Sequence, residues 1–269
     1  MKNEIRELTV IYVLTFTLLF VPSGFDGVMT NIVYILAFAL PTFLGILLLR
    51  RKPSEEYDRY LIIKKEELFL TLPVIFPCIL LIFSLSSLSN LFMNLAGFSS
   101  TPVVDDNLPM AILLSAALPA ILEEVAFRYL PMRFIGKRSP RLCIILSALM
   151  FALVHHSFFS YLYAFGAGVV FMLIDLICDS VIPSVIIHFL NNVLAIFWIR
   201  YSGVAGFPTA LVLVLVGLAL ISGVAIFLMR KRYAPRLSGA VAVGEKFEFT
   251  ADPVFLIIPS LIVAVAELI

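Results

Sequence analysis

The sequence predicts an all-α membrane protein, and its composition is what leads to this fold class. Hydrophobic residues make up 62% of the 269 residues and charged residues only 14%, whereas charged residues are about a quarter of an ordinary soluble domain. The mean hydropathy is +1.08. Such a chain has too little polar surface for a soluble globule and too many apolar residues for a disordered protein. A net charge of +1 without a basic tract also argues against nucleic-acid binding.

Apolar stretches long enough to cross a bilayer define a bundle of about eight transmembrane helices. A spanning helix needs about 20 mostly apolar residues. The stretches that approach or reach this length are 8–21, 31–49, 69–92, 109–127, 142–159, 160–178, 181–199 and 209–229. A ninth hydrophobic segment, 254–269, is short and contains Pro259, so it could cross, lie at the interface or pack on the bundle. The mixed charges of the leader MKNEIRE favour a retained first span over a cleaved signal peptide.

Basic residues gather on one side of the predicted bundle. With eight spans, the N-terminus and the segments 50–68, 128–141 and 230–246 lie on the same side and hold 18 of the 19 Lys and Arg residues. Cytoplasmic loops are enriched in Lys and Arg. We therefore predict a multi-pass protein of the cell membrane with its N-terminus in the cytoplasm.

Ionisable side chains fall inside predicted spans four to seven and inside none of the other four. Such residues are costly in hydrocarbon, so each indicates a functional site by default. The six residues are Glu123, Glu124, His155, His156, Asp175 and His188. The glutamates and the first two histidines are about equally far from the Ser139-Pro140 turn, some 20 Å by helical rise. Antiparallel helices would bring them level, so we expect one shared polar cavity in the bilayer.

Spacing along the fourth span separates the two glutamates. Glu124 and Arg128 are four residues apart, so they can form an ion pair on one helical face. Glu123 lies about 100° away around the helix and can point elsewhere. Asp175 lies near the end of the sixth span, where we expect a structural or supporting role.

Two further pairs lie four residues apart and therefore share a helical face. Phe151 and His155 form one pair, and His188 and Asn192 form the other. The second pair can aim two hydrogen-bond donors at one oxygen, as the stabilisation of an oxyanion requires. His156 points about 100° away from His155, so we expect it to support the site structurally.

These residues form three motifs in a fixed order: EExxxR at 123–128, FxxxH at 151–155 and HxxxN at 188–192. Together, on successive membrane helices, they resemble the CAAX-protease and bacteriocin-processing (CPBP) family, the intramembrane glutamate endopeptidases related to type II CAAX prenyl proteases. The resemblance covers roughly residues 105–200, which we take as the catalytic core. Residues 1–104 then form three N-terminal helices with a charged cytoplasmic connector. The eighth span and the tail occupy residues 201–269.

The resemblance implies a role for each motif residue. Glu123 would be the general base that activates water, and His155 would help to hold and polarise that water. His188 and Asn192 would stabilise the oxyanion of the tetrahedral intermediate, while Glu124 would be an orienting group or second carboxylate. Spacing alone leaves open which glutamate is the base. The typical substrate of the family is an isoprenylated CAAX peptide that loses its last three residues, so we expect a prenylated or other membrane-associated substrate.

Two other functions fit the same polar cluster. Glu and His side chains can bind zinc with an open position for water, which would make this a zinc-dependent membrane protease. However, the chain has no H-E-x-x-H motif, and the resemblance implies a metal-independent reaction without a cofactor. Buried Glu and His residues also serve proton relays, so a non-catalytic scaffold or transport subunit is the other alternative. No internal repeat of the transporter kind is visible, and the sequence leaves the oligomeric state open.

Overall fold

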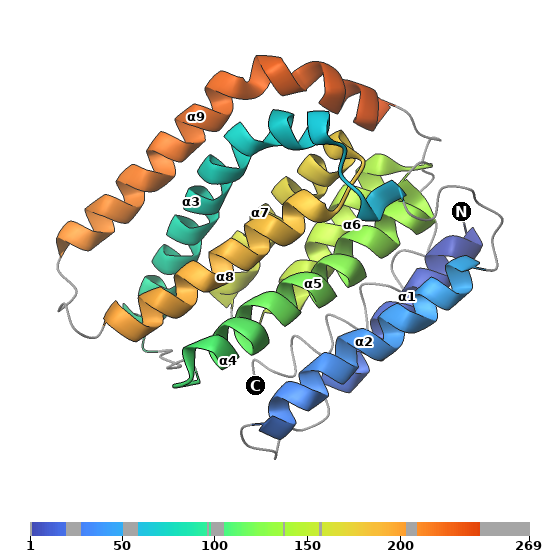
Figure 1. Cartoon of the computed structure of the whole chain (residues 1–269), viewed down its shortest axis with the longest axis horizontal. Coiled ribbons are helices and arrows are strands. Elements are labelled where there is room, and N and C mark those ends of the chain that lie inside the picture. The colour runs from blue at the N-terminus through green and yellow to red at the C-terminus, as the bar shows by residue number, and fades with distance from the viewer. Residues whose placement is uncertain are drawn as a thin grey trace.

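The chain is almost entirely helical in the part that its computed structural model describes, with no strand among those residues (Figure 1). The described residues are 2–19, 28–50, 59–95, 97, 105–136, 138–155, 158–202 and 209–242. The α-helices are α1 (Lys2–Leu19), α2 (Val28–Arg50), α3 (Lys65–Leu95), α4 (Leu108–Ile112), α5 (Leu118–Glu124), α6 (Pro140–Leu153), α7 (Phe158–Cys178), α8 (Ile182–Ser202) and α9 (Thr209–Ala242). Shorter helical segments are the 3-10 helix η1 (Arg59–Leu61) and the π-helices η2 (Leu113–Ala117), η3 (Val125–Tyr129) and η4 (Met132–Gly136).

Each of the eight predicted spans coincides with a helical part of the structure. Among the described residues, six helices are long and apolar enough to cross a membrane, so the chain is an all-α multi-pass membrane protein, as predicted. The fifth predicted span, 142–159, is too long, because α6 ends at Leu153 after 14 residues. At 1.5 Å per residue, α6 is only about 21 Å long, less than the roughly 30 Å of the hydrocarbon core. The ninth segment, 254–269, lies outside the described residues.

The helices that carry the motifs lie in the middle of the bundle (Figure 1). On one side, α1 and α2 pack together as a hairpin, and α2 contacts α5. On the other side, α9 packs on α3, and α3 in turn contacts α7 and α8. The motif-bearing elements α5, α6 and α8, together with α7, are therefore flanked by a helix pair on each side.

The fourth predicted span is a helical rod that runs from α4 to η4. The side chain of Asn107 caps its start by accepting a hydrogen bond from the Met110 amide at 3.3 Å, and Pro109 stands in its first turn, where a missing amide hydrogen costs nothing. Three π-helical segments interrupt the rod, and such segments often occur at functional sites. One of them, η3, begins directly after Glu124 and contains Arg128. The helix therefore continues past Arg128 to Gly136.

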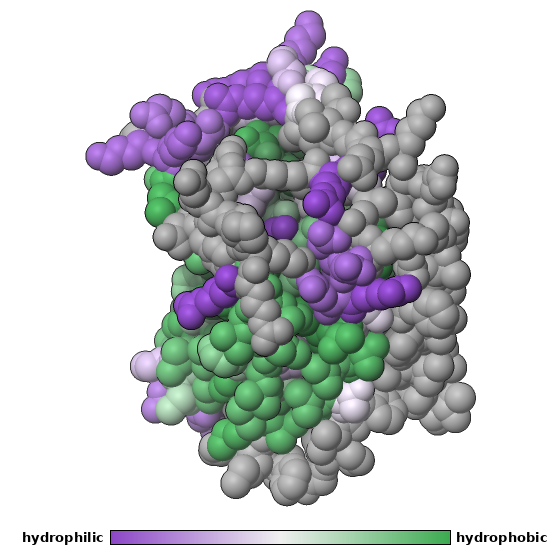
Figure 2. All heavy atoms as spheres, turned by 90° about the vertical axis from the view of Figure 1, so that its right-hand side faces the viewer, coloured by the Kyte–Doolittle hydropathy of each residue, from purple (hydrophilic) through white to green (hydrophobic). Residues whose placement is uncertain are grey.

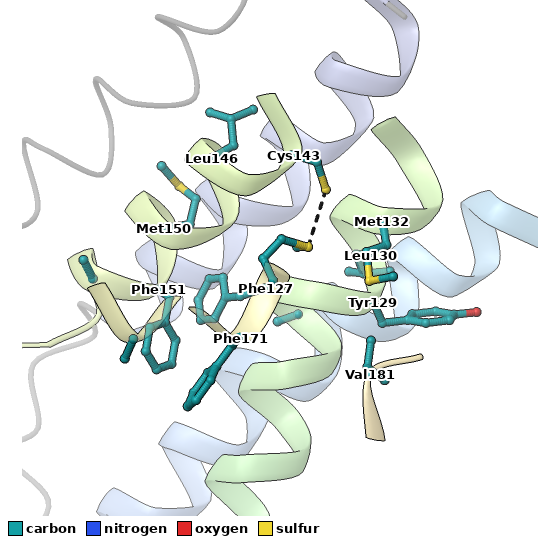
Figure 3. Packing of buried hydrophobic residues seen from close by; sticks show 14 of the residues in the cluster. Phe127, Tyr129, Leu130, Met132, Cys143, Leu146, Met150, Phe151, Phe171 and Val181 are labelled. Carbon is teal, nitrogen blue, oxygen red and sulfur yellow. Dashed lines mark hydrogen bonds between the residues drawn. The ribbon is translucent and has the colours of Figure 1, made fainter. Parts of the chain in front are cut away.

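Aromatic side chains connect the helices of the core beneath the polar residues. Phe127 of η3, Phe151 of α6 and Phe171 of α7 lie close together in Figure 3. The ring centroid of Phe151 is 6.2 Å from that of Phe127 and 6.0 Å from that of Phe171. Gly168 lets α7 approach α6 closely, because a Cβ at this position would lie 2.8 Å from Ala148 Cα. Small residues at such contacts allow membrane helices to pack tightly. The core therefore holds α6 and α7 firmly where the motif residues begin.

Candidate active site

The two adjacent glutamates of α5 have different neighbours. Oε1 of Glu123 accepts a hydrogen bond from the Tyr34 hydroxyl of α2. Glu124 lies toward α8, where its Oε1 is 2.7 Å from Nδ1 of His188, and its Oε2 is 3.2 Å from Nε of Arg128. Because successive residues of a helix diverge by about 100°, the two side chains reach different neighbouring helices, α2 and α8. The spacing predicted both this divergence and the Glu124–Arg128 pair.

The Glu124–Arg128 pair is enclosed completely, with both side chains 0% exposed. Nε and Oε2 are at ion-pair distance, but their alignment is not that of a hydrogen bond. Two aromatic rings also contact the guanidinium: Cζ of Arg128 lies 4.2 Å from the ring centroid of Phe151 and 5.3 Å from that of Phe171. Cation–π contacts of this kind are strongest where water is excluded. The guanidinium is therefore stabilised by one carboxylate and two ring faces.

A second buried carboxylate belongs to the same group of charges. Asp175 of α7 is 0% exposed and interacts electrostatically with both Glu124 and Arg128. Its Oδ1 accepts a hydrogen bond of 3.2 Å from the backbone amide of Ser184. Glu124, Arg128, Asp175 and His188 thus form what we call the ionic cluster, which joins α5, η3, α7 and α8.

His155 lies just beyond the end of α6 and caps that end. Its Nδ1 is 2.9 Å from the carbonyl oxygen of Phe151, one of the carbonyls that a helix end leaves without a backbone partner. A carbonyl can only accept, so Nδ1 carries the proton and the lone pair of a neutral ring is on Nε2. The ring lies 5.9 Å from that of Tyr163, which interacts electrostatically with Glu123. This brings His155 into the neighbourhood of Glu123.

The HxxxN motif lies on α8, where His188 and Asn192 are one helical turn apart. The His188 ring is 5.5 Å from Phe151, nearly perpendicular to it, and 5.9 Å from Phe171. Asn192 is partly exposed, and its side chain makes no hydrogen bond to any residue that the structure describes. The amide of Asn192 can therefore donate to a bound group.

Two further predictions from the sequence concern His156 and the absence of a metal. His156, predicted to support the site, lies outside the described residues. Within the described ranges, no three His, Cys, Asp or Glu side chains gather as a metal-binding group. The expectation that the reaction needs no metal stays a prediction.

Tyr34 is the site residue that the sequence argument missed. It lies in the second span, which contains no Asp, Glu, Lys, Arg or His among residues 31–49, so the distribution of charged residues does not point to it. Its ring packs 5.0 Å from Phe38, which in turn contacts Phe127 at 5.7 Å. A hydroxyl in an otherwise apolar span was the available signal, but only the packing of α2 on α5 gives it a partner.

Comparison with known proteins relates part of the chain to a protein family. Residues 105–194 match the family model described as "Rce1-like: Type II CAAX prenyl endopeptidase Rce1-like". Residues 105–194 therefore form an Rce1-like domain. No curated protein and no solved structure matches the chain. The Rce1-like domain contains all three motifs, whereas Tyr34 lies outside it. The family is one of CAAX-type intramembrane proteases, in agreement with the motifs.

The packing of the Rce1-like domain predicts a stabilising role for Phe151. We expect Phe151→Leu to lower the free energy of unfolding by about 2 kcal/mol, because the substitution removes the ring face beneath a desolvated guanidinium. Phe16→Leu, in a buried part of α1, is the matched control and should show only the smaller cost of a change in shape, below about 1.5 kcal/mol. Denaturant unfolding in mixed micelles measures both, and equal costs would contradict the cation–π role.

Proposed function

We propose that this chain is an intramembrane endopeptidase that hydrolyses a peptide bond near the C-terminus of a prenylated CAAX-type protein, with Glu123 as the general base. The unequal surroundings of the two glutamates support this assignment. Glu124 is 0% exposed and engages Arg128 and His188, whereas Glu123 is 7% exposed. Oε2 of Glu123 has no hydrogen-bond partner among the described residues. A base needs a carboxylate oxygen that is not already engaged by the protein, and Oε2 of Glu123, although buried, makes no hydrogen bond within the described part of the chain.

In the proposed reaction, Glu123 Oε2 accepts a proton from a water molecule while the water oxygen attacks the scissile carbonyl carbon. Nε2 of His155 holds the same water by accepting its second hydrogen. The carbonyl oxygen becomes an oxyanion. When the intermediate collapses, the C–N bond breaks and the proton on Glu123 passes to the leaving nitrogen. The products are a new C-terminal carboxylic acid and the free amine of the released peptide, and Glu123 is regenerated.

The oxyanion would be bound by His188 and Asn192, and the geometry gives Glu124 a part in this. Nδ1 of His188 faces a carboxylate oxygen at 2.7 Å, so Nδ1 carries a proton. For Nε2 to donate to an oxyanion, the ring must then carry both protons. The Glu124 carboxylate stabilises this imidazolium. Glu124 would therefore act through His188 as a positioning residue, with Arg128 and Asp175 holding it in place.

A lipid-anchored substrate suits a site of this depth. The Rce1-like domain is built from membrane helices, and its polar residues lie among buried aromatic side chains. A prenyl group could remain in the bilayer while the backbone of the attached peptide reaches Glu123. We also propose that the basic ends of the helices, and with them the N-terminus, face the cytoplasm.

The proposal is tested with a fluorogenic prenylated CAAX peptide and the purified protein in lipid nanodiscs. We expect cleavage that releases the last three residues and that persists after treatment with a strong zinc chelator. The same peptide without its prenyl group should be cleaved more slowly. Loss of activity on chelation, restored by zinc, would replace the glutamate mechanism with the zinc alternative. Failure to cleave any prenylated peptide would contradict the proposed substrate class.

Tyr34 provides a test of how the base is held. We expect Tyr34→Phe to lower kcat about tenfold or more with little change in KM, because a hydrogen bond to a charged group is worth about 1.5–3 kcal/mol. Tyr12→Phe is a matched control: Tyr12 belongs to the same α1–α2 hairpin, but its hydroxyl donates to the backbone oxygen of Ala126 at 3.3 Å. Tyr12→Phe should leave kcat unchanged. Equal kcat values for the two variants would show that Tyr34 serves packing alone.

A further inference from the structure

A second feature of the bundle lies between α3, α7 and α9, away from the glutamates. It is a cavity of about 350 Å³ with an almost wholly apolar lining. Cys78 of α3, Ile174 of α7 and Gly223 of α9 are among its walls, while Arg230 and Tyr233 provide its polar groups on α9. Its volume lies in the range of sites that bind small molecules, about 300–1,000 Å³.

The cavity is elongated along the helices and has one cationic end. Its α3 wall runs from Thr71 to Leu81, about 15 Å by helical rise. The start of α3 lies beside the end of α9, as the ion pair between Glu67 and Arg236 shows. Arg230 therefore lies at the Thr71 end of the cavity. An extended hydrocarbon chain with a charged group at one end matches this shape.

Helix α7 separates this cavity from the candidate active site. Ile174 lines the cavity, whereas its neighbour Asp175 belongs to the ionic cluster on the other side of α7. Phe171, on the same side as Asp175, contacts His188. A prenyl group in this cavity would therefore have α7 between it and the catalytic groups. The occupant is thus a molecule other than the substrate.

The charge around the mouth determines the kind of headgroup. Arg230, Lys231, Arg232 and Arg236 are all exposed at this end of α9, and Figure 2 shows hydrophilic residues gathered at the top of the face on which α9 ends. One guanidinium N–H of Arg230 donates to the carbonyl of Phe227 at 2.8 Å, which anchors the group and leaves its other N–H donors for a ligand. Basic clusters beside a membrane helix attract anionic lipids.

We infer that this cavity binds one acyl chain of an anionic glycerophospholipid, with the lipid phosphate at Arg230. The site is independent of the proposed peptidase activity, because it shares no residue with the catalytic groups. Lipid tails gain nothing from leaving other lipid tails. Selectivity for this lipid must therefore come from the charge of its headgroup. The shape of the cavity then determines how long the acyl chain stays bound.

The test uses phosphatidylglycerol that carries a diazirine on its acyl chain, with the full chain in nanodiscs and mapping of labelled peptides by mass spectrometry. We expect labelling concentrated on α3, α7 and α9, and weaker labelling by phosphatidylcholine with the same acyl chain. Gly223→Phe should abolish this preferential labelling of α3, α7 and α9, because a side chain at position 223 has open space before it and would fill the cavity. Gly217→Phe, on the same helix and also in open space, should change nothing.

The headgroup is tested separately with Arg230→Gln, which should reduce the preference for phosphatidylglycerol about fivefold, the effect of one basic residue near an anionic headgroup. Arg6→Gln, which removes an exposed basic residue of α1, should leave the preference unchanged. Labelling that is spread evenly over the lipid-facing helices, or that is identical in Gly223→Phe, would overturn the inference. So would displacement of the label by a prenylated peptide, because the cavity would then belong to the substrate.

Discussion

Glu123→Gln should lower kcat for cleavage of a prenylated CAAX peptide by about 10²- to 10⁴-fold, the contribution typical of a general base. The amide is nearly the same size as the carboxylate and can still accept the hydrogen bond from Tyr34, but it cannot take a proton from water. We therefore expect the variant to fold as the wild type does. Initial rates in nanodiscs, together with unfolding curves in mixed micelles, measure the two effects separately.

Glu124→Gln is the natural comparison, because it makes the same chemical change at the next residue. This substitution removes the carboxylate beside the buried Arg128, and loss of one member of a buried ion pair costs about 3–5 kcal/mol. We therefore expect a clear loss of stability here and none in Glu123→Gln. A folded, stable Glu124→Gln without activity, beside an active Glu123→Gln, would transfer the role of base to Glu124.

Arg128→Met should be the most destabilising single substitution in the ionic cluster, with a cost of about 3–5 kcal/mol. Methionine fills much of the volume but leaves Glu124 and Asp175, both fully buried, without their cation. Equilibrium unfolding in mixed micelles provides the measurement.

Two variants make this expectation specific. Arg138→Met removes an arginine whose ion pair with Glu4, 2.9 Å long, is partly exposed, so it should cost no more than about 1 kcal/mol. Adding Asp175→Asn to Arg128→Met should restore part of the stability, because it removes one of the two uncompensated carboxylates. Equal stability of Arg128→Met and Arg138→Met would contradict the structural role of the cluster.

What the sequence predicted well was determined by local helix geometry. The Glu124–Arg128 pair and the divergence of Glu123 follow from 3.6 residues per turn. The placement of the polar residues in four consecutive spans, and the apolar character of the rest, gave the all-α membrane class. The three motifs predicted the resemblance to CAAX-type proteases, which the Rce1-like match over residues 105–194 confirms.

What the sequence did not predict depends on contacts between distant segments. The bond from His188 to Glu124 joins residues 64 positions apart, and the bond from Tyr34 to Glu123 joins residues 89 positions apart. The early end of α6 was also missed, because the predicted span 142–159 contains no proline or glycine to mark a helix end. The helix ends where Val154 leaves it and the His155 ring bonds to the Phe151 carbonyl.

The most direct test of the central claim, that water and not a protein nucleophile attacks the peptide bond, is a single-turnover reaction in ¹⁸O-labelled water. Wild-type protein in nanodiscs is mixed with a prenylated CAAX peptide and quenched, and the intact masses of protein and products are measured. Water activated by Glu123 predicts release of the last three residues, one ¹⁸O atom in the new C-terminal carboxylate, and a protein mass that never changes. A transient adduct of the peptide on the protein, or a product without ¹⁸O, would contradict the mechanism.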